Sequence, residues 1–311
     1  MMRWLRSLWV RAGITALILA YLLRQVDTGT ALRAMLRTDP TALATVALLV
    51  LLDRVVMIWR WILLLRASGT PIAARTAAHI FLVSSFVGSF LPAGVGGDAA
   101  RAYALGQRTA RRGAAVASVA IDRILGVVAI ALMGAFGVAV YAGRHADPQV
   151  RMVAISSAAV VLVASAAAVW ADRWIRWLPD AWHHVTLVRL PLRIADSVAT
   201  YRDQPRTLLV VFGLSILVQV LRVLQAYGLG VGLGLTVPFG YYLVFMPIGL
   251  LMLLLPLSVS GFGLPQGVIV WLLRPQGVPD ELSFALSTLI VLSGLFGNLP
   301  GALLYLRARQ H

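Results

Sequence analysis

Six ionisable side chains lie inside long apolar stretches of this sequence. They comprise two aspartate–arginine neighbour pairs and two further arginines: Asp53, Arg54, Arg60, Asp122, Arg123 and Arg222. A charged group at the centre of a bilayer costs roughly 2.5 kcal/mol or more, so such residues are functional by default. Adjacent residues of a helix do not face each other, so each member of a neighbour pair needs a partner on another helix. The pattern predicts either buried ion pairs between helices or a polar groove that holds a lipid headgroup.

Arg222 shares one helical face with two amide side chains. Gln219 and Gln225 lie three residues before and three residues after it, a spacing that places all three side chains on one side of a helix. A polar face within an apolar stretch must look into protein or into water. We therefore expect Arg222 and Gln219 to belong to a binding site.

A related motif occurs once in each half of the chain. Residues 91–97 read Leu-Pro-Ala-Gly-Val-Gly-Gly, residues 255–261 read Leu-Pro-Leu-Ser-Val-Ser-Gly, and both follow a short apolar run. Arg60 and Arg222 precede the prolines of the two motifs by 32 and 34 residues, which suggests that they are related by a repeat. Gly/Pro-interrupted apolar segments at corresponding places of two halves indicate the binding site of a membrane translocator.

The motifs also carry the backbone chemistry that an anion site needs. Interrupted helices leave N–H groups unsatisfied unless protein or a polar cavity takes them up, and such helix ends attract anions such as a phosphodiester. Glycine lets the backbone turn tightly and approach a ligand; alternatively, the glycines only permit close helix packing. The candidate binding residues of the two motifs are Pro92, Gly94, Gly96, Gly97, Pro256, Ser258, Gly261 and Gly263.

Asp98 follows the first motif directly and Arg101 lies three residues further on, and both are candidate binding residues. A carboxylate at this place is expected to cap a helix by accepting its first free N–H groups. The other interpretation is contact with a cationic substrate group or with a coupling proton. The two roles do not exclude each other.

The composition requires a polytopic membrane protein. The chain has 311 residues, of which 60% are hydrophobic and 13% charged, and its mean hydropathy is +0.86; soluble proteins carry about 25% charged residues. All 27 basic residues are arginine and the net charge is +15. These arginines fall in short loops between apolar stretches, which favours the positive-inside rule over nucleic-acid binding. The absence of cysteine excludes thiol catalysis, cysteine metal sites and disulfides.

The apolar stretches predict an all-α fold of about six full spans and two broken or re-entrant hairpins. A full span needs about 20 apolar residues. The candidate spans are residues 8–23, 41–65, 114–142, 151–170, 207–232 and 282–306, and the shorter pieces are 77–91, 239–255 and 265–273. We expect a single integral membrane domain with repeat 1 over about 8–142 and repeat 2 over about 151–306. Three spans per half would make the second repeat inverted.

Arginine counts favour one orientation of this domain. With a cytoplasmic N-terminus and both hairpins re-entrant, 16 arginines lie in the cytoplasmic segments and five in the outer segments. Both termini are then cytoplasmic. Whether residues 77–91 and 239–273 turn back or cross stays open. Arg3 and Arg6 before the first apolar stretch resemble a signal peptide without a cleavage site, which favours an uncleaved signal anchor.

Residues 171–206 form the one sizeable loop and are expected to lie on the cytoplasmic membrane surface. Tryptophans and a helical apolar pattern with interleaved arginines are typical of an interfacial helix. The adjacent His183 and His184 lack further ligands, so no metal site is predicted. No P-loop, acidic metal motif or serine–histidine arrangement is present. We expect no enzyme activity and no cofactor.

Three segments resemble a known family. Residues 86–103, which read Phe-Val-Gly-Ser-Phe-Leu-Pro-Ala-Gly-Val-Gly-Gly-Asp-Ala-Ala-Arg-Ala-Tyr, resemble the signature of the flippase-like membrane region of lysylphosphatidylglycerol synthases. Residues 119–126 and 256–267 look like its second and third blocks. The resemblance implies an inner-membrane protein that moves lipid between leaflets. The aminoacyl-transferase domain of the fused members is missing, so synthase activity is not implied. Gln266 replaces an expected carboxylate, which argues against a cationic contact there.

We therefore expect a translocator in the bacterial cytoplasmic membrane for a phosphate-bearing lipid such as phosphatidylglycerol or its aminoacyl form. The hairpin ends, Arg60 and Arg222 would hold the phosphate, and Asp98, Asp122 and Arg123 would line the headgroup path. The alternatives are a carrier of polyisoprenyl phosphate or a glycolipid, and a non-transporting scaffold for a lipid- or glycan-synthesis enzyme. The expected partners are a membrane phospholipid or polyprenyl lipid and, as a further candidate, a lipid-modifying or glycan-synthesis enzyme, with no nucleic acid.

Overall fold

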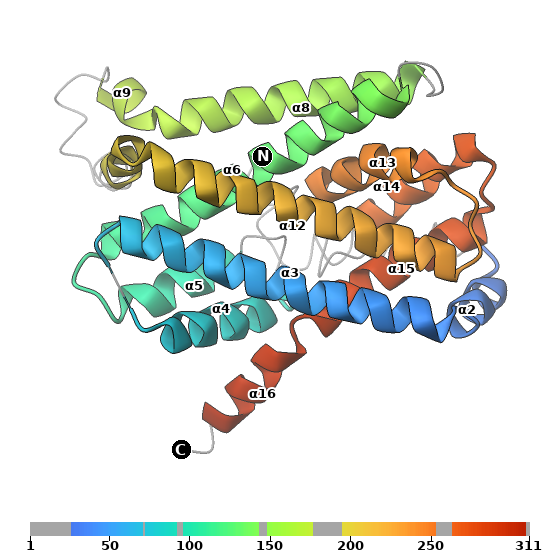
Figure 1. Cartoon of the computed structure of the whole chain (residues 1–311), viewed down its shortest axis with the longest axis horizontal. Helices are drawn as coiled ribbons and strands as arrows, with labels where there is room; N and C mark the ends of the chain where they lie inside the picture. The colour runs from blue at the N-terminus through green and yellow to red at the C-terminus, as the bar shows by residue number, and fades with distance from the viewer. Residues whose placement is uncertain are drawn as a thin grey trace, which may run out of the picture.

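The computed structural model describes residues 26–70, 72–91, 96–142, 148–176, 195–252 and 263–308, and this part of the chain is helical without strands (Figure 1). Two long helices, α3 (Pro40–Ala67) and α12 (Pro205–Gly232), lie side by side across the molecule. The other elements are α2 (Thr28–Leu36), α4 (Ala74–Gly88), α5 (Gly96–Gly106), α6 (Arg112–Gly137), η2 (Val138–Ala142), α8 (Pro148–Val169), α9 (Ala171–Arg176), η3 (Thr200–Asp203), α13 (Phe239–Met252), α14 (Leu264–Leu273), η4 (Arg274–Gln276), α15 (Asp280–Phe296) and α16 (Leu299–Ala308).

The helices fall where the apolar stretches predict them. Within the described residues, four stretches are long and apolar enough to cross a membrane: residues 40–67, 112–141, 205–232 and 280–307. The helix predicted over 151–170 is α8, whose 22 residues measure about 33 Å. The predicted first span, residues 8–23, lies outside the described residues.

One predicted helix is interrupted. The span predicted over 282–306 is present at residues 280–307, but its helix is interrupted, because α15 ends at Phe296 and α16 begins at Leu299. Two features explain the break. Pro300 has no N–H to continue the helical hydrogen bonds. At Gly297 a Cβ would lie 2.7 Å from Arg54 Nε, so the backbone passes close to α3.

The first interrupted segment turns back. Helix α4 has 15 residues, about 22 Å, which is shorter than the hydrocarbon core of about 30 Å. Its partner α5 packs along it so closely that a Cβ on Gly88 would lie 2.6 Å from Gly97 Cα. Gly69, which precedes α4, lies against Arg111, which follows α5, so both arms meet the same end of the molecule. The tip of this hairpin, residues 92–95, lies outside the described residues.

The second interrupted segment turns back as well, and it starts at the other end. The hydroxyl of Tyr241, early in α13, donates to the carbonyl oxygen of Leu272, late in α14. The start of α13 follows the end of α12, where Asp39 N donates to Gly232 O at 3.1 Å. The opposite end of the α3–α12 pair leads into α4. The two hairpins therefore start from opposite ends of the molecule; residues 253–262, the second tip, lie outside the described part.

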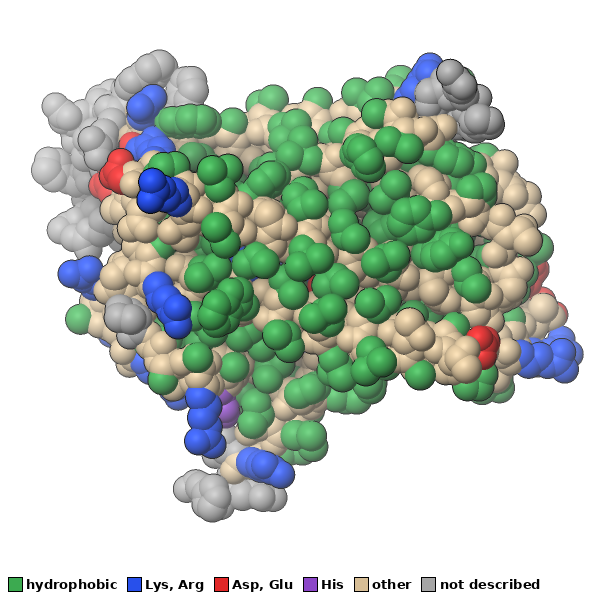
Figure 2. Space-filling view, viewed as in Figure 1, with side chains coloured by type: hydrophobic (Ala, Val, Ile, Leu, Met, Phe, Trp, Pro, Cys, Tyr) green, Lys and Arg blue, Asp and Glu red, His purple; other side chains and the backbone are tan. Residues whose placement is uncertain are grey.

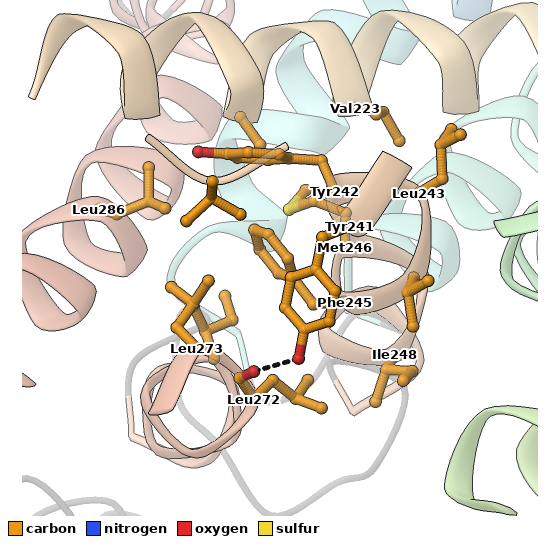
Figure 3. Close-up of a cluster of buried hydrophobic side chains, with 14 of the residues drawn as sticks. Val223, Tyr241, Tyr242, Leu243, Phe245, Met246, Ile248, Leu272, Leu273 and Leu286 are labelled. Atoms are coloured by element: carbon orange, nitrogen blue, oxygen red, sulfur yellow. Dashed lines mark hydrogen bonds between the residues drawn. The ribbon is translucent and has the colours of Figure 1, made fainter. Parts of the chain in front are cut away.

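The two halves pack on each other reciprocally. Helix α4 packs against α16, and α13 packs against α6. Both contacts are close-packed at a glycine: a Cβ on Gly301 would collide with the Leu82 carbonyl, and a Cβ on Gly137 with the Leu243 carbonyl. The largest buried apolar cluster of the described residues joins α12, α13, α14 and α15 around Tyr241, Tyr242 and Phe245 (Figure 3). Both hairpins are thereby fixed to the helices of the opposite half.

Arginines collect at one end of the described helices. That end carries Arg66, Arg75, Arg108, Arg111, Arg112, Arg173, Arg202 and Arg206, and the opposite end carries Arg33, Arg37, Arg151 and Arg274. Between the ends, apolar side chains cover the face over α3 and α12 (Figure 2). This apolar band between polar ends is the surface that a bilayer requires.

The predicted interfacial loop is described in part. Arg202 of η3 donates to Asp172 of α9 at 2.7 Å, and this hydrogen bond holds the pKa of the Asp172 carboxyl below its usual range. Tyr201 donates to the Leu64 carbonyl at 3.1 Å, and burial raises its pKa to about 12. The loop is therefore anchored to the end of α3. His183, His184 and the rest of residues 177–194 lie outside the described part.

Candidate functional site

A cavity of about 400 Å³ lies at the meeting of α3, α12 and the first hairpin. Its further walls come from α6, α13 and the α15–α16 junction. The sequence-predicted residues that line it are Arg60, Gly97, Asp98, Arg101, Asp122, Arg123, Gln219 and Arg222. Gly96 and Gly263 are described and do not line it. Pro92, Gly94, Pro256, Ser258 and Gly261 lie outside the described residues.

Asp122 is the centre of a buried ion-pair network. Its Oδ1 accepts from Arg60 Nε at 2.7 Å and its Oδ2 from Arg101 NH2 at 3.0 Å. All three side chains are about 95% buried or more. Arg60 also donates to Ser215 Oγ at 3.0 Å. The network joins α3, α5, α6 and α12, because a buried carboxylate is tolerated where cations and hydrogen bonds surround it.

Aromatic rings fix Arg101 further. Its guanidinium carbon lies 5.1 Å from the Trp61 ring centroid and 5.2 Å from that of Phe81, within the range of cation–π attraction. The Trp61 indole donates to Ser118 Oγ at 3.3 Å. Arg60 and Arg101 are thus immobilised at the back of the site, with their charges already neutralised in part by Asp122.

Asp98 and Arg123 form the exposed edge of this network. Asp98 Oδ1 accepts from Arg101 at 3.0 Å, and its Oδ2 lies 3.5 Å from Arg123 NH1. The Arg123 side chain is 38% exposed, so it can turn toward a ligand in the cavity. The expected N-cap role of Asp98 is wrong: α5 begins at Gly96, and Asp98 lies in its first turn with its carboxylate engaged by arginines.

A second charged group occupies the middle of α3. Asp53 Oδ1 lies 3.5 Å from Arg222 Nε of α12, as the expected pairing between helices requires. Asp53 Oδ2 also lies 3.9 Å from its neighbour Arg54, a weak contact that the helical spacing does not predict. Arg54 instead donates to the Gly294 carbonyl at 3.1 Å. Arg222 is 24% exposed toward the cavity and has no closer acceptor than Asp53 among the described residues.

The electrostatics of the cavity favour an anion. Among the described residues, five arginines and three aspartates line it, a formal surplus of two positive charges. Gly97 places the start of α5 at the same wall, where the partial positive charge of a helix N-terminus adds to the attraction. Among the described residues no group of three or more His, Asp or Glu side chains could hold a metal ion.

Asn298 is a lining residue that the sequence reasoning missed. It lies at the break between α15 and α16, and its Nδ2 donates to Ser89 Oγ of the first hairpin at 2.8 Å. The signal was present as Gly-Asn-Leu-Pro at 297–300, a helix-breaking sequence inside an apolar stretch. Gln266 lies outside this cavity: its Oε1 accepts from Gly263 N and its Nε2 donates to Thr288.

Comparison with protein families decides the relationship. The model of the lysylphosphatidylglycerol synthase TM region matches residues 8–301. The chain belongs to this family. The match confirms the resemblance carried by residues 86–103, and it makes the chain a membrane protein related to lipid modification or transport. No curated protein matches the chain. Within this lysylphosphatidylglycerol synthase TM region, the charged cavity is built by both halves of the matched segment.

Proposed function

We propose that this protein translocates a phosphate-bearing lipid, such as phosphatidylglycerol or its aminoacyl form, between the leaflets of the bacterial cytoplasmic membrane. The observation that carries the proposal is a cavity with five arginines and three aspartates enclosed by apolar helices. Ionisable groups at this depth mark substrate paths in membrane proteins. No nucleotide motor or enzyme activity is invoked.

The proposed roles follow from exposure. Arg222 and Arg123 are the cavity arginines with the most exposed side chains, and each lies 3.5 Å from its aspartate partner, so they bind the phosphate together with the start of α5. Asp98, whose side chain is 23% exposed, lines the same cavity and contacts the cationic part of the lipid headgroup where the lipid carries one. Arg60, Arg101 and Asp122 are paired and buried, so they position the binding residues instead of contacting the lipid.

The reciprocal packing supports an inverted repeat. Each hairpin starts from its own end and packs against the last helices of the opposite half. In transporters with inverted repeats, one repeat rocks against the other around a fixed central site. We place the arginine-rich end in the cytoplasm, with both termini on that side, in accord with the positive-inside rule.

Lipid exchange in liposomes tests the proposal. Purified protein would be reconstituted with fluorescent phosphatidylglycerol, its aminoacyl form or a polyisoprenyl phosphate, and leaflet exchange followed by quenching from outside. Wild-type protein should accelerate one of these lipids over protein-free vesicles. Arg222→Ala should abolish the acceleration and stay folded, because Arg222 is partly exposed and loosely paired.

The matched control is Arg37→Ala, which removes an exposed arginine at the opposite end from the arginine-rich loops; it should transport normally. Acceleration of polyisoprenyl phosphate alone would establish the carrier alternative. No acceleration of any lipid by folded protein would contradict transport and favour a scaffold for a lipid- or glycan-synthesis enzyme.

A further inference from the structure

One wall of the cavity contains polar atoms that the fold leaves without hydrogen-bond partners. They are Arg54 Nε, Gln219 Oε1, Gln225 Nε2 and Asn298 Oδ1, each buried, and all four residues line the cavity. We call these four residues the amide wall. Gln219 is 97% buried as a residue. A buried donor or acceptor without a partner costs about 1–3 kcal/mol, so this set favours a ligand that satisfies it.

The hydrogen bonds around Asn298 fix which of its atoms is available. Ser89 Oγ donates to the Ser85 carbonyl at 3.2 Å, so it can accept from Asn298 Nδ2 at 2.8 Å. The other amide atom, Oδ1, is then a buried acceptor without a partner, on a residue that lines the cavity. The contact also ties the α15–α16 junction to the first hairpin.

The remaining members of the amide wall surround Arg222. Gln219 and Gln225 lie one turn before and one turn after it on α12, and Arg54 lies across from it on α3, where Arg222 and Arg54 both contact Met57 Sδ. A phosphate held by Arg222 is therefore flanked by two acceptors and two donors. The wall is adjacent to the proposed phosphate site and distinct from the Asp98–Arg123 edge.

This mixture of donors and acceptors selects one headgroup chemistry. Phosphate oxygens only accept, and an ammonium group only donates, whereas a hydroxyl does both. We propose that the amide wall binds the hydroxyl groups of the lipid headgroup, so that the substrate is a phospholipid with a glycerol- or sugar-like polyol beyond the phosphate. The inference rests on the proposed function for its role in transport, but binding tests it separately.

Two lipids that differ only in hydroxyls provide the probe. Phosphatidylglycerol and phosphatidyl-1-propanol share the phosphodiester, the charge and the three-carbon headgroup. Their equilibrium binding to purified full-length protein in detergent would be measured by native mass spectrometry or fluorescence titration, and their exchange in liposomes in parallel. Phosphatidylglycerol should bind about tenfold more tightly, the effect of one to three net hydrogen bonds.

Gln219→Met and Gln225→Met remove the amides at nearly constant volume. Each should weaken phosphatidylglycerol binding severalfold and leave phosphatidyl-1-propanol binding unchanged. The control Gln107→Met replaces an exposed glutamine outside the cavity and should change neither. Thermal unfolding of each variant identifies a loss of fold.

The outcomes separate the two proposals. Equal wild-type binding of both lipids overturns the amide wall as a hydroxyl site, even if both lipids are transported. An equal loss of both lipids in the methionine variants also overturns it, because the glutamines would then only hold the fold. Selective binding without transport of either lipid keeps the hydroxyl site and contradicts the translocator.

Discussion

Replacement of Asp122 by asparagine should destabilise this protein far more than an equal loss of charge at its surface. Asp122→Asn keeps the size of the side chain and removes the negative charge that neutralises Arg60 and Arg101. Both guanidinium groups are about 95% buried, at 2.7 and 3.0 Å from the carboxylate. Removal of one partner from a buried ion pair costs about 3–5 kcal/mol, because the remaining charge is left without compensation.

Asp280→Asn provides the matched control. Asp280 also pairs with an arginine at 2.7 Å, but that arginine, Arg274, is 52% exposed, and an exposed pair contributes about 0–1 kcal/mol. Thermal unfolding of both variants in detergent measures the contrast. In a large domain, each kcal/mol lost from the free energy of unfolding lowers Tm by about 2 °C. Asp122→Asn should therefore lower Tm by about 6–10 °C and Asp280→Asn by about 2 °C or less.

A double variant tests the cause of the loss. Arg101→Gln in the Asp122→Asn background removes one of the two arginines that lose Asp122 as a partner, so the pair of substitutions should cost less than the sum of the single ones. If Asp122→Asn lowers Tm no more than Asp280→Asn does, the network is hydrated. The interpretation of Arg60 and Arg101 as buried positioning residues would then be refuted.

Three further outcomes are expected. Gly88→Ala puts a Cβ 2.6 Å from the α5 backbone and should cost about 1–3 kcal/mol in unfolding. Gly213→Ala, inside α12 with nothing within 4 Å, should be neutral or stabilise by up to about 1 kcal/mol, because alanine favours a helix over glycine; equal effects would contradict the close hairpin. Because the chain has no cysteine, Arg37→Cys should react with an impermeant maleimide in intact cells and Arg108→Cys only after lysis, and the reverse pattern would invert the proposed orientation. The pKa of Asp172 is lowered by its arginine partner, so this ion pair stabilises the fold above the unfolded-state pKa of about 3.9. The difference in Tm between wild type and Asp172→Asn should therefore be present at pH 6 and shrink as the pH falls below 4. A difference in Tm that stays constant with pH would argue against the pair.

The amino-acid sequence by itself determines the helices and the residues that need partners. Hydropathy and length place α3, α6, α8 and α12 within a few residues of their observed bounds, because a bilayer demands about 20 apolar residues per span. The Gly/Pro motifs predict the sites of the two interruptions. The cost of burying charge identifies Asp53, Asp122 and Arg222 as residues of interest without any structure.

Tertiary structure alone decides which partners those residues find. Asp122 pairs with Arg60 and Arg101, which lie 62 and 21 residues away, and helical periodicity says nothing about such distances. The tertiary structure also decides that Arg60 is buried while Arg222 faces the cavity, because the exposure of each side chain depends on how α3 and α12 cross. The break at Gly297 brings Asn298 to the site, and the close approach of α3 that requires this glycine exists only in the packed molecule. The spacing of residues in the sequence determines which side chains share one face of a helix. The packing of those faces on each other determines which of the side chains meet at the site.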